Sequence, residues 1–251
     1  MTESLNSVMK LALSILQEAG NRGIHLKALG GVAINLLCAQ AQAKYPMLAR
    51  LPGDIDLIGL SEDASRIGEV VGKVGFTPDK EFNFLNARER MRFARDAIRL
   101  DILLDIFRMC HTWSLRERIQ TPDSLTIPLG DLLLTKLQIV ELSEKDLKDI
   151  AALVVTLDDI RPEQRNAVTS YVAEKTARDW GLYHTCCLSL GTLGAWISSD
   201  QFLSSRSVVE RGIATVTGSM YQANKSGWWY IRSLVGPKIR WYSRPEEVLE
   251  A

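Results

Sequence analysis

The sequence predicts an α/β (α+β) fold: a mixed sheet flanked by helices, followed by a C-terminal helical domain. Short runs rich in branched apolar residues have the length and composition of strands. Segments with helical spacing of apolar residues alternate with these runs, whereas only helical patterns follow after about residue 115. We therefore expect two domains, residues 1–115 and residues 116–251. The strand-like runs lie at 24–29, 54–60 and 98–107.

The chain begins with a predicted amphipathic helix, because apolar side chains from Leu5 to Ala19 recur at helical spacing. This segment lacks the basic stretch and uninterrupted apolar run of a secretory signal. The segment 24–29 then alternates apolar and polar residues like a strand and leads into Gly30 and Gly31. A helix over 32–44 is expected after this glycine turn.

The next strand, 54–60, is too short and too rich in β-branched residues for a helix. Apolar residues at helical spacing predict an amphipathic helix over 62–74. Short strands are expected around 82–84 and 91–93. The run 98–107 is rich in branched apolar residues and predicts a buried strand.

Helices dominate the second half of the sequence. One is expected over 131–142, where Leu133, Leu137 and Val140 share a face. Ser143 followed three residues later by Asp146 suggests a capping box that opens a second helix. Pro162 suits the first turn of a third helix.

Composition excludes several classes of protein. Thirty basic and thirty acidic residues cancel, so no net charge favours a nucleic-acid or membrane partner. No run of about 18 apolar residues predicts a membrane span. The cysteines show neither a disulfide framework nor paired metal-ligand spacing, so we expect a reducing, cytoplasmic location. They are Cys38, Cys110, Cys186 and Cys187.

Acidic residues predict a metal site. Asp54 and Asp56 are separated by one residue on a predicted strand, so both side chains point to one side of the sheet. Two carboxylates this close repel each other, and a bound Mg²⁺ or Mn²⁺ would keep both ionised. Hard oxygen ligands of this kind suit Mg²⁺.

A third carboxylate is expected from a neighbouring strand, where Asp101 and Asp105 are the candidates. Asp101 is preferred because Asp105 lies nearer the end of the strand, and an aspartate among Leu and Ile needs a partner. Gly30 and Gly31 would let the backbone approach a triphosphate at a helix N-terminus.

These motifs resemble the nucleotidyltransferase superfamily, which has the polymerase beta-like fold. The resemblance rests on Gly30-Gly31, on D-I-D at 54–56 and on L-D-I-L-L-D at 100–105. Two later segments, DLLLTK at 131–136 and K-D-x-x-D at 145–149, resemble motifs of the AbiEii-like nucleotidyltransferases. That family includes toxins of abortive-infection toxin–antitoxin systems. Arg50 falls near the place of a basic residue common there, and the resemblance spans residues 24–157.

The resemblance implies metal-dependent transfer of a nucleoside monophosphate from an NTP to an acceptor. Asp54, Asp56 and Asp101 would be the catalytic and metal-binding residues, with Mg²⁺ or Mn²⁺ as cofactor. The nucleotide would be bound by Gly30, Gly31, Lys136, Lys145 and Asp146. An RNA such as tRNA, or a protein, would be the acceptor, and a cognate antitoxin would be a partner.

Other interpretations stay open for the later motifs and for the whole chain. Asp146 also suits a capping box with Ser143, and Lys145 with Asp149 suits an ion pair along a helix. The chain could instead be a small-molecule transferase of the aminoglycoside-modifying kind, whose usual mark is an acidic acceptor pocket. It could also be a catalytically inactive module of the same fold that binds nucleic acid or protein.

Two further segments allow a functional and a structural interpretation. Cys110 and His111 could be soft ligands or a nucleophile and base, although a buried Cys beside a hydrogen-bonded His is expected. No acidic residue occurs between Glu210 and Glu246, where cations and aromatics alternate. This composition suits RNA, and it also suits a packed helical surface with solvated cations. The cations are Arg211, Lys225, Arg232, Lys238, Arg240 and Arg244, and the aromatics are Trp228, Trp229, Tyr230, Trp241 and Tyr242.

Overall fold

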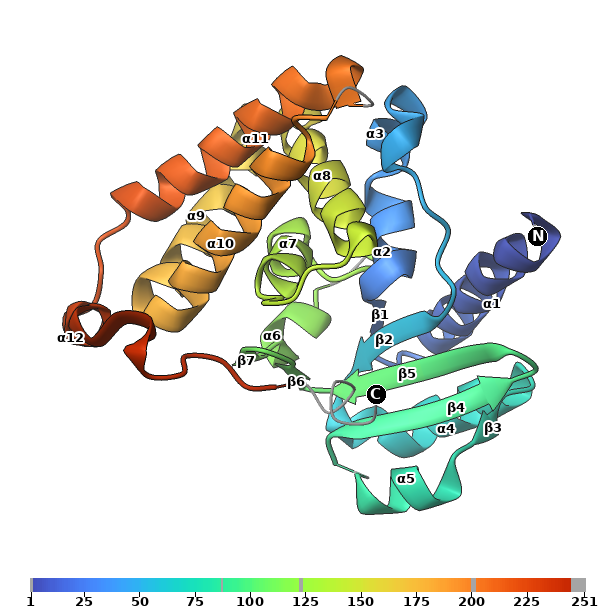
Figure 1. Cartoon of the computed structure of the whole chain (residues 1–251). Helices are drawn as coiled ribbons and strands as arrows, with labels where there is room; N and C mark the ends of the chain where they lie inside the picture. Colours follow the sequence, from blue (N-terminus) through green and yellow to red (C-terminus); the bar gives the residue numbers. More distant parts are fainter. Residues whose placement is uncertain (1, 87, 122–123, 200–201, 245–251) are drawn as a thin grey trace. The chain divides into compact units, whose positions relative to one another are not determined.

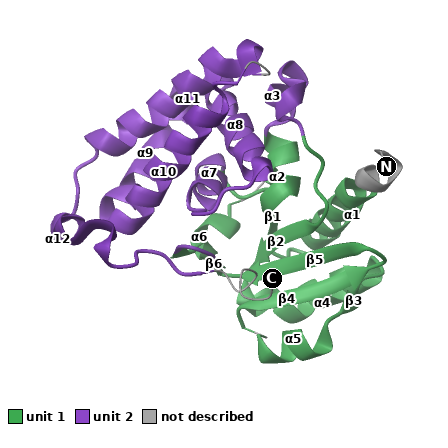
Figure 2. Cartoon of the chain, in the orientation of Figure 1, with its two compact units in different colours: residues 1–37, 50–107, 112–128 green, residues 38–49, 108–111, 129–251 purple. Residues whose placement is uncertain are grey.

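The computed structural model describes residues 2–86, 88–121, 124–199 and 202–244 of the chain. These residues form two compact units (Figure 2). The first unit consists of residues 1–37, 50–107 and 112–128, and the second of residues 38–49, 108–111 and 129–251.

A five-stranded mixed sheet forms the centre of the first unit (Figure 1). Its strand order is β1-β2-β5-β4-β3, in which β2 and β5 are parallel and every other neighbouring pair is antiparallel. The expected mixed sheet followed by helices is therefore confirmed. The strands are β1 (Leu26–Ala28), β2 (Ile55–Gly59), β3 (Thr77–Pro78), β4 (Arg90–Arg95) and β5 (Ile98–Leu104).

One face of this sheet is the hydrophobic core of the unit. Ile55 and Leu57 of β2 and Ile102 of β5 are fully buried. Helix α4 covers this face, since a Cβ on Gly59 would collide with the side chain of Ile67. Side chains at the alternate positions therefore project from the opposite face. The helices of the unit are α1 (Thr2–Asn21), α2 (Gly30–Leu37), α4 (Ala64–Lys73), α5 (Lys80–Leu85) and α6 (Arg116–Ile119), with a 3₁₀ turn η2 (Ser61–Asp63) before α4.

The strand expected around 82–84 is wrong, because this segment forms helix α5. Asp79 supplies the helix cap, as its carboxylate accepts a hydrogen bond from the backbone N–H of Phe82. The cap therefore outweighs the strand propensity of the two phenylalanines in this short segment. The strand expected around 91–93 is confirmed within β4.

Two expected elements are interrupted. The helix expected over 32–44 stops at Leu37, and a separate helix α3 (Ala39–Lys44) follows, then a 3₁₀ turn η1 (Pro46–Leu48). The strand expected over 98–107 breaks at Asp105, whose φ of 59° lies in the left-handed region and cannot continue a strand. The chain resumes as β6 (Ile106–Arg108), which pairs with β7 (Thr112–Ser114).

Helices build the second unit. The capping box expected at Ser143 and Asp146 is present at the start of α8, and Pro162 occupies the first turn of α9. Helix α7 ends at Leu137, earlier than expected, and the following Gln138 is buried. Gly212 lies against the backbone of Val154, which lets α11 and α8 approach closely. The helices are α7 (Leu129–Leu137), α8 (Glu144–Asp159), α9 (Pro162–Arg178), α10 (Trp180–Trp196), α11 (Leu203–Gln222) and α12 (Gly227–Val235), followed by a 3₁₀ turn η4 (Gly236–Lys238).

An aromatic cluster attaches the segment after α12 to helix α10. The ring of His184 stacks on Trp180 and meets the edge of Trp241. The indole N–H of Trp241 donates to Thr185 Oγ1 at 3.0 Å, and His111 Nε2 lies 2.9 Å from the same oxygen. Burial lowers the pKa values of both histidines below their usual 6.5.

Acidification should weaken the second unit through these two histidines. Because the folded protein resists protonating His111 and His184, the unfolded chain binds more protons at low pH. The stabilisation is complete above the unfolded pKa and is lost as pH falls towards the folded values. Unfolding midpoints in urea, followed by tryptophan fluorescence, should therefore fall between roughly pH 7.5 and pH 5.

The His111→Gln/His184→Gln variant is the comparison. Its midpoint should depend less on pH over this window than that of the parent protein, whatever its absolute stability. A His25→Gln variant is the control, because His25 lies in the first unit. Equal pH dependence in the double variant and the parent would contradict the assignment of this loss of stability to His111 and His184.

Candidate functional site

Two aspartates lie side by side on the face of the sheet opposite α4. Asp56 of β2 and Asp101 of β5 are direct register partners in the parallel pair. Paired residues of neighbouring strands point to the same face, and neighbouring strands lie about 4.8 Å apart. Both side chains are half-buried, whereas the residues beside them in each strand are buried on the other face. The strand register therefore brings these two carboxylates together.

The carboxylate of Asp56 lies directly against Gly30, the first residue of helix α2. Gly30 has a φ of 52°, and a Cβ at this position would collide with Asp56 Oδ2. The backbone N–H of Leu29 also donates to the carbonyl oxygen of Asp56 at 2.8 Å. Gly30 is thus required twice, for its backbone conformation and for the close approach. The partial positive charge at the start of α2 favours an anion here.

Arg50 lies over the first turn of α2. A Cβ on Gly31 would lie 3.3 Å from both terminal nitrogens of Arg50 and 3.0 Å from Pro52. Asn35 ties this loop to the helix, because its amide donates to the carbonyl oxygens of Gly31 and Arg50. Asp54 follows the loop, immediately before β2, and is half-buried. The structure therefore brings Gly30, Gly31, Asp54, Asp56 and Asp101 into one region of the first unit, together with Arg50.

Asp101 is held by two arginines of β4. Arg90 donates to both carboxylate oxygens, from Nε to Oδ1 at 2.7 Å and from Nη2 to Oδ2 at 2.6 Å. Arg92, the register partner of Asp101, reaches Oδ2 from Nε at 3.4 Å. The sequence did not predict these arginines as site residues. Arg90 and Arg92 alternate with the apolar Met91 and Phe93 at the strand expected around 91–93, and this pattern could have revealed them.

An aromatic ring orients the second arginine. The guanidinium of Arg92 lies 3.8 Å from the ring centroid of Phe82, which is on helix α5. Asn83 binds the backbone of Arg92 twice, accepting from its N–H at 2.6 Å and donating to its carbonyl oxygen at 3.0 Å. Helix α5 is therefore fastened to β4, and the plane of the Arg92 guanidinium is defined by stacking.

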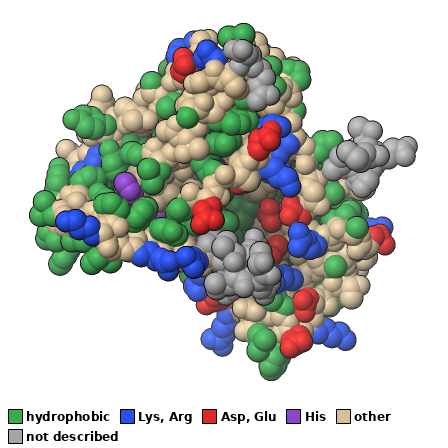
Figure 3. Space-filling model, in the orientation of Figure 1, with side chains coloured by type: hydrophobic (Ala, Val, Ile, Leu, Met, Phe, Trp, Pro, Cys, Tyr) green, Lys and Arg blue, Asp and Glu red, His purple; other side chains and the backbone are tan. Residues whose placement is uncertain are grey.

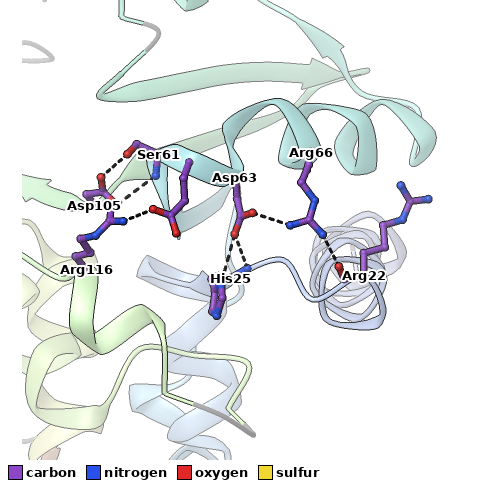
Figure 4. A network of polar contacts seen from close by, with 8 residues as sticks. Arg22, His25, Ser61, Asp63, Arg66, Asp105 and Arg116 are labelled. Carbon is purple, nitrogen blue, oxygen red and sulfur yellow. Dashed lines mark hydrogen bonds and ion pairs between the residues drawn. The ribbon is translucent and has the colours of Figure 1, made fainter.

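Asp105, the other candidate for the third carboxylate, belongs to a different network (Figure 4). It accepts hydrogen bonds from the backbone N–H of Ser61 at 3.2 Å and from the Ser61 hydroxyl at 2.6 Å. Arg116 also donates to Asp105 at 3.0 Å and pairs with Glu62. These contacts fix the 3₁₀ turn that follows β2. Of the two candidates, only Asp101 is the register partner of Asp56.

The nucleotide-binding candidates of the second unit take part in helix packing. Lys136 of α7 contacts Asp146 at 3.1 Å and Asp149 at 2.9 Å, both on α8. Asp146 also accepts from Ser143 in the capping box. The capping box confirms the structural interpretation of Asp146. Asp149 pairs with Lys136, and Lys145 is exposed on α8.

A divalent cation fits the site in part. Carboxylates such as Asp54 and Asp56 are hard donors that suit Mg²⁺ or Mn²⁺. The geometry of Asp101 does not present a third ligand, because both of its oxygens accept from Arg90. Across the described ranges, which omit residues 1, 87, 122–123, 200–201 and 245–251, no cluster of three or more His, Cys, Asp or Glu side chains is arranged to hold a metal ion.

Cys110 and His111 have structural partners. Both are buried, and the backbone N–H of His111 donates to the side chain of Gln138 at 2.8 Å. The carbonyl oxygen of Cys110 accepts from the backbone N–H of Ser243. The structure therefore favours the buried, hydrogen-bonded interpretation over a nucleophile and its base.

The basic and aromatic region of the second unit divides into packed and exposed parts. Trp229 donates to the carbonyl oxygen of Thr176, while Trp228 is 79% exposed. Figure 3 shows hydrophobic and basic side chains side by side on the visible face around α12. We name the exposed part the α12 surface. It comprises Tyr221, Trp228, Tyr230, Ile231, Leu234, Lys238, Ile239, Arg240 and Arg244.

In the part of the chain that the structure describes, no helix has the length and apolar character needed to span a membrane.

Comparisons with known proteins show weak similarity to solved structures. No family model and no curated protein matches the chain. Among solved structures, the chain is similar to the solution structure of the antibiotic-resistance factor ANT(2'')-Ia, with 13% identity and a TM-score of 0.43. The match covers 68% of this chain and 94% of that one. Similarity at this level does not by itself establish a shared activity.

Replacing Gly30 should test the contact with Asp56. Gly30→Ala forces a side chain into a left-handed conformation and against a carboxylate, so the free energy of unfolding should fall by about 1–3 kcal/mol. Gly20→Ala is the matched control, since a Cβ there meets nothing within 4 Å. Urea denaturation measures both variants.

A double-mutant cycle measures how much of the lost stability comes from the collision between the new Cβ and Asp56. Adding Asp56→Ala to Gly30→Ala should recover part of the lost stability, because the carboxylate that the new Cβ meets is gone. Strict additivity of the two substitutions would show that Asp56 does not press against Gly30.

Proposed function

We propose that the protein is a nucleotidyltransferase that moves a nucleoside monophosphate from an NTP to an acceptor. One observation supports this most: Asp56 and Asp101, both half-buried, are paired on one face of the sheet, at the glycine-rich start of helix α2. A carboxylate pair next to a helix N-terminus combines sites for a cation and for phosphate groups. The motifs that resemble the superfamily supply the same residues.

Asp54 and Asp56 are the proposed ligands of Mg²⁺ or Mn²⁺. When bound, such a cation would offset the repulsion between the carboxylates and neutralise charge on the leaving phosphates. Charged side chains that share a partly buried face of the sheet suit the binding of a charged ligand.

Asp101 is the proposed partner of the acceptor hydroxyl. A carboxylate accepts a hydrogen bond from a hydroxyl, and this orients the attacking oxygen and receives its proton as the new bond forms. The role requires Asp101 to exchange its contact with Arg90 for one with the acceptor.

The triphosphate is proposed to lie at the start of α2. Arg50 places a guanidinium against Gly31 in the first turn of this helix, where it can pair with phosphate. Lys136, Lys145 and Asp146 remain predicted nucleotide contacts on the resemblance alone. Of the three, Lys136 and Asp146 pair with each other, so Lys145 is the one whose side chain is exposed.

RNA, such as the end of a tRNA, is the proposed acceptor. The α12 surface exposes aromatic rings on which bases can stack, among them Tyr221 and Tyr230 at 77% and 57% exposure. Exposed Lys238, Arg240 and Arg244 can contact phosphates. A protein acceptor, a toxin role and a cognate antitoxin stay predictions from the family resemblance.

Transfer of label from an NTP tests the proposal. Purified protein would be incubated with each α-³²P-labelled NTP, Mg²⁺ or Mn²⁺, and total RNA or lysate protein. Labelled RNA is the expected product, and Asp54→Ala/Asp56→Ala should lower its rate by about a hundredfold or more. Asp96→Asn, which alters an exposed aspartate of the same unit, should leave the rate unchanged.

The outcomes separate the candidate functions. Transfer that survives in the double variant would refute the assignment of the site. Label on protein instead of RNA would select the other acceptor, and label on an added aminoglycoside would favour the small-molecule transferase. Absence of label in every reaction, with NTP still retained on a filter, would favour the inactive binding module.

A further inference from the structure

Two guanidinium groups converge on the single carboxylate of Asp101. Arg90 and Arg92 occupy alternate positions of β4, so both project from the sheet face that carries Asp101. Their side chains are 22% and 31% exposed, so solvent reaches both. A pair of arginines around one carboxylate is a concentration of positive charge directly beside the proposed reaction centre.

We propose that Arg90 and Arg92 form a binding site for the phosphates of the NTP, and that this site is closed onto Asp101 until the nucleotide arrives. The proposal rests on the proposed function, because it adds these arginines to the triphosphate contacts proposed at the start of α2. When the nucleotide binds, the guanidinium of Arg90 leaves the carboxylate of Asp101 and contacts the phosphates. Asp101 is then released to meet the acceptor.

The exchange follows from the geometry of the guanidinium group. The planar guanidinium of an arginine has two parallel N–H donors, which match the oxygens of a phosphate as well as those of a carboxylate. Asp101 offers one negative charge, whereas a polyphosphate offers several. A ligand that reaches the arginines therefore competes well with the carboxylate that they hold.

The two arginines have different roles in this site. Arg92 is stacked on Phe82, and Asn83 fixes its backbone, so its guanidinium is already oriented before a ligand binds. Arg90 is farther from the ring, at 5.9 Å, and makes the short two-pronged contact with Asp101. Arg92 is thus the fixed phosphate contact, and Arg90 is the group that exchanges partners.

A permanent ion pair is the competing explanation for the same geometry. A partly buried, bidentate Arg–carboxylate pair can stabilise the sheet by joining β4 to β5. In that case the loss of Arg90 would lower stability and leave the binding of polyphosphate unchanged. Affinity for an anion, measured without metal or acceptor, separates the two explanations.

Inorganic tripolyphosphate is the probe, and isothermal titration without divalent cations is the measurement. Arg90→Gln and Arg92→Gln should each weaken binding by about tenfold, because each removes a charged donor to the phosphates. Arg99→Gln is the matched control. It alters an exposed arginine of β5 that also lies on the face of Asp101 but pairs with Ala94 instead of Arg90 or Arg92, so a loss of affinity larger than about twofold would show that any cation of this face contributes.

A second pair of variants tests the exchange itself. Asp101→Asn should tighten tripolyphosphate binding, because the carboxylate that competes for Arg90 is lost. In Arg90→Gln/Asp101→Asn this gain should be much smaller than in the background with Arg90 present. Circular dichroism and melting temperatures would confirm that each variant is folded.

The results bear separately on the site and on the reaction. Unchanged affinity in Arg90→Gln and Arg92→Gln, or an equal gain from Asp101→Asn with and without Arg90, would overturn the proposal. Tripolyphosphate binding that depends on both arginines, in a protein that transfers no label, would refute the transferase function while leaving an anion site.

Discussion

The parallel pairing of β2 with β5 is the constraint on which the candidate site depends. It sets Asp56 opposite Asp101, and it places Ile55, Leu57 and Ile102 on the face that α4 covers. A shift of the register by one residue would bury one aspartate in the core. The core packing that stabilises the first unit therefore also fixes the distance between the two carboxylates.

Positively charged groups surround the two carboxylates of Asp56 and Asp101. The start of helix α2 lies next to Asp56, and Arg90 with Arg92 holds Asp101. Two neighbouring carboxylates on a partly desolvated surface need positive charge nearby. The protein supplies it from backbone and arginines, and the proposed reaction would replace part of it by a cation and rearrange the rest.

The sequence predicted those parts of the fold that depend on local patterns. Alternation and branched residues located the strands at 24–29 and 54–60, and Ser143 with Asp146 located the start of α8. The prediction failed where one contact determines the local structure, as at Asp79, whose carboxylate caps the following segment as helix α5. It also failed at Asp105, where one residue with positive φ ends the strand. The partners of Asp101 were missed because cross-strand pairing cannot be deduced from spacing along one segment.

Formation of a disulfide between positions 56 and 101 tests the central claim most directly. In a chain with its native cysteines replaced, the variant Asp56→Cys/Asp101→Cys places two thiols on directly paired residues of neighbouring strands, about 5 Å apart at Cα and within disulfide range. After mild oxidation, peptide mass spectrometry should find the cross-link between these positions. A folded protein that leaves both thiols free, while Asp56→Cys/Asp105→Cys forms the bond instead, would contradict the pairing on which the account depends.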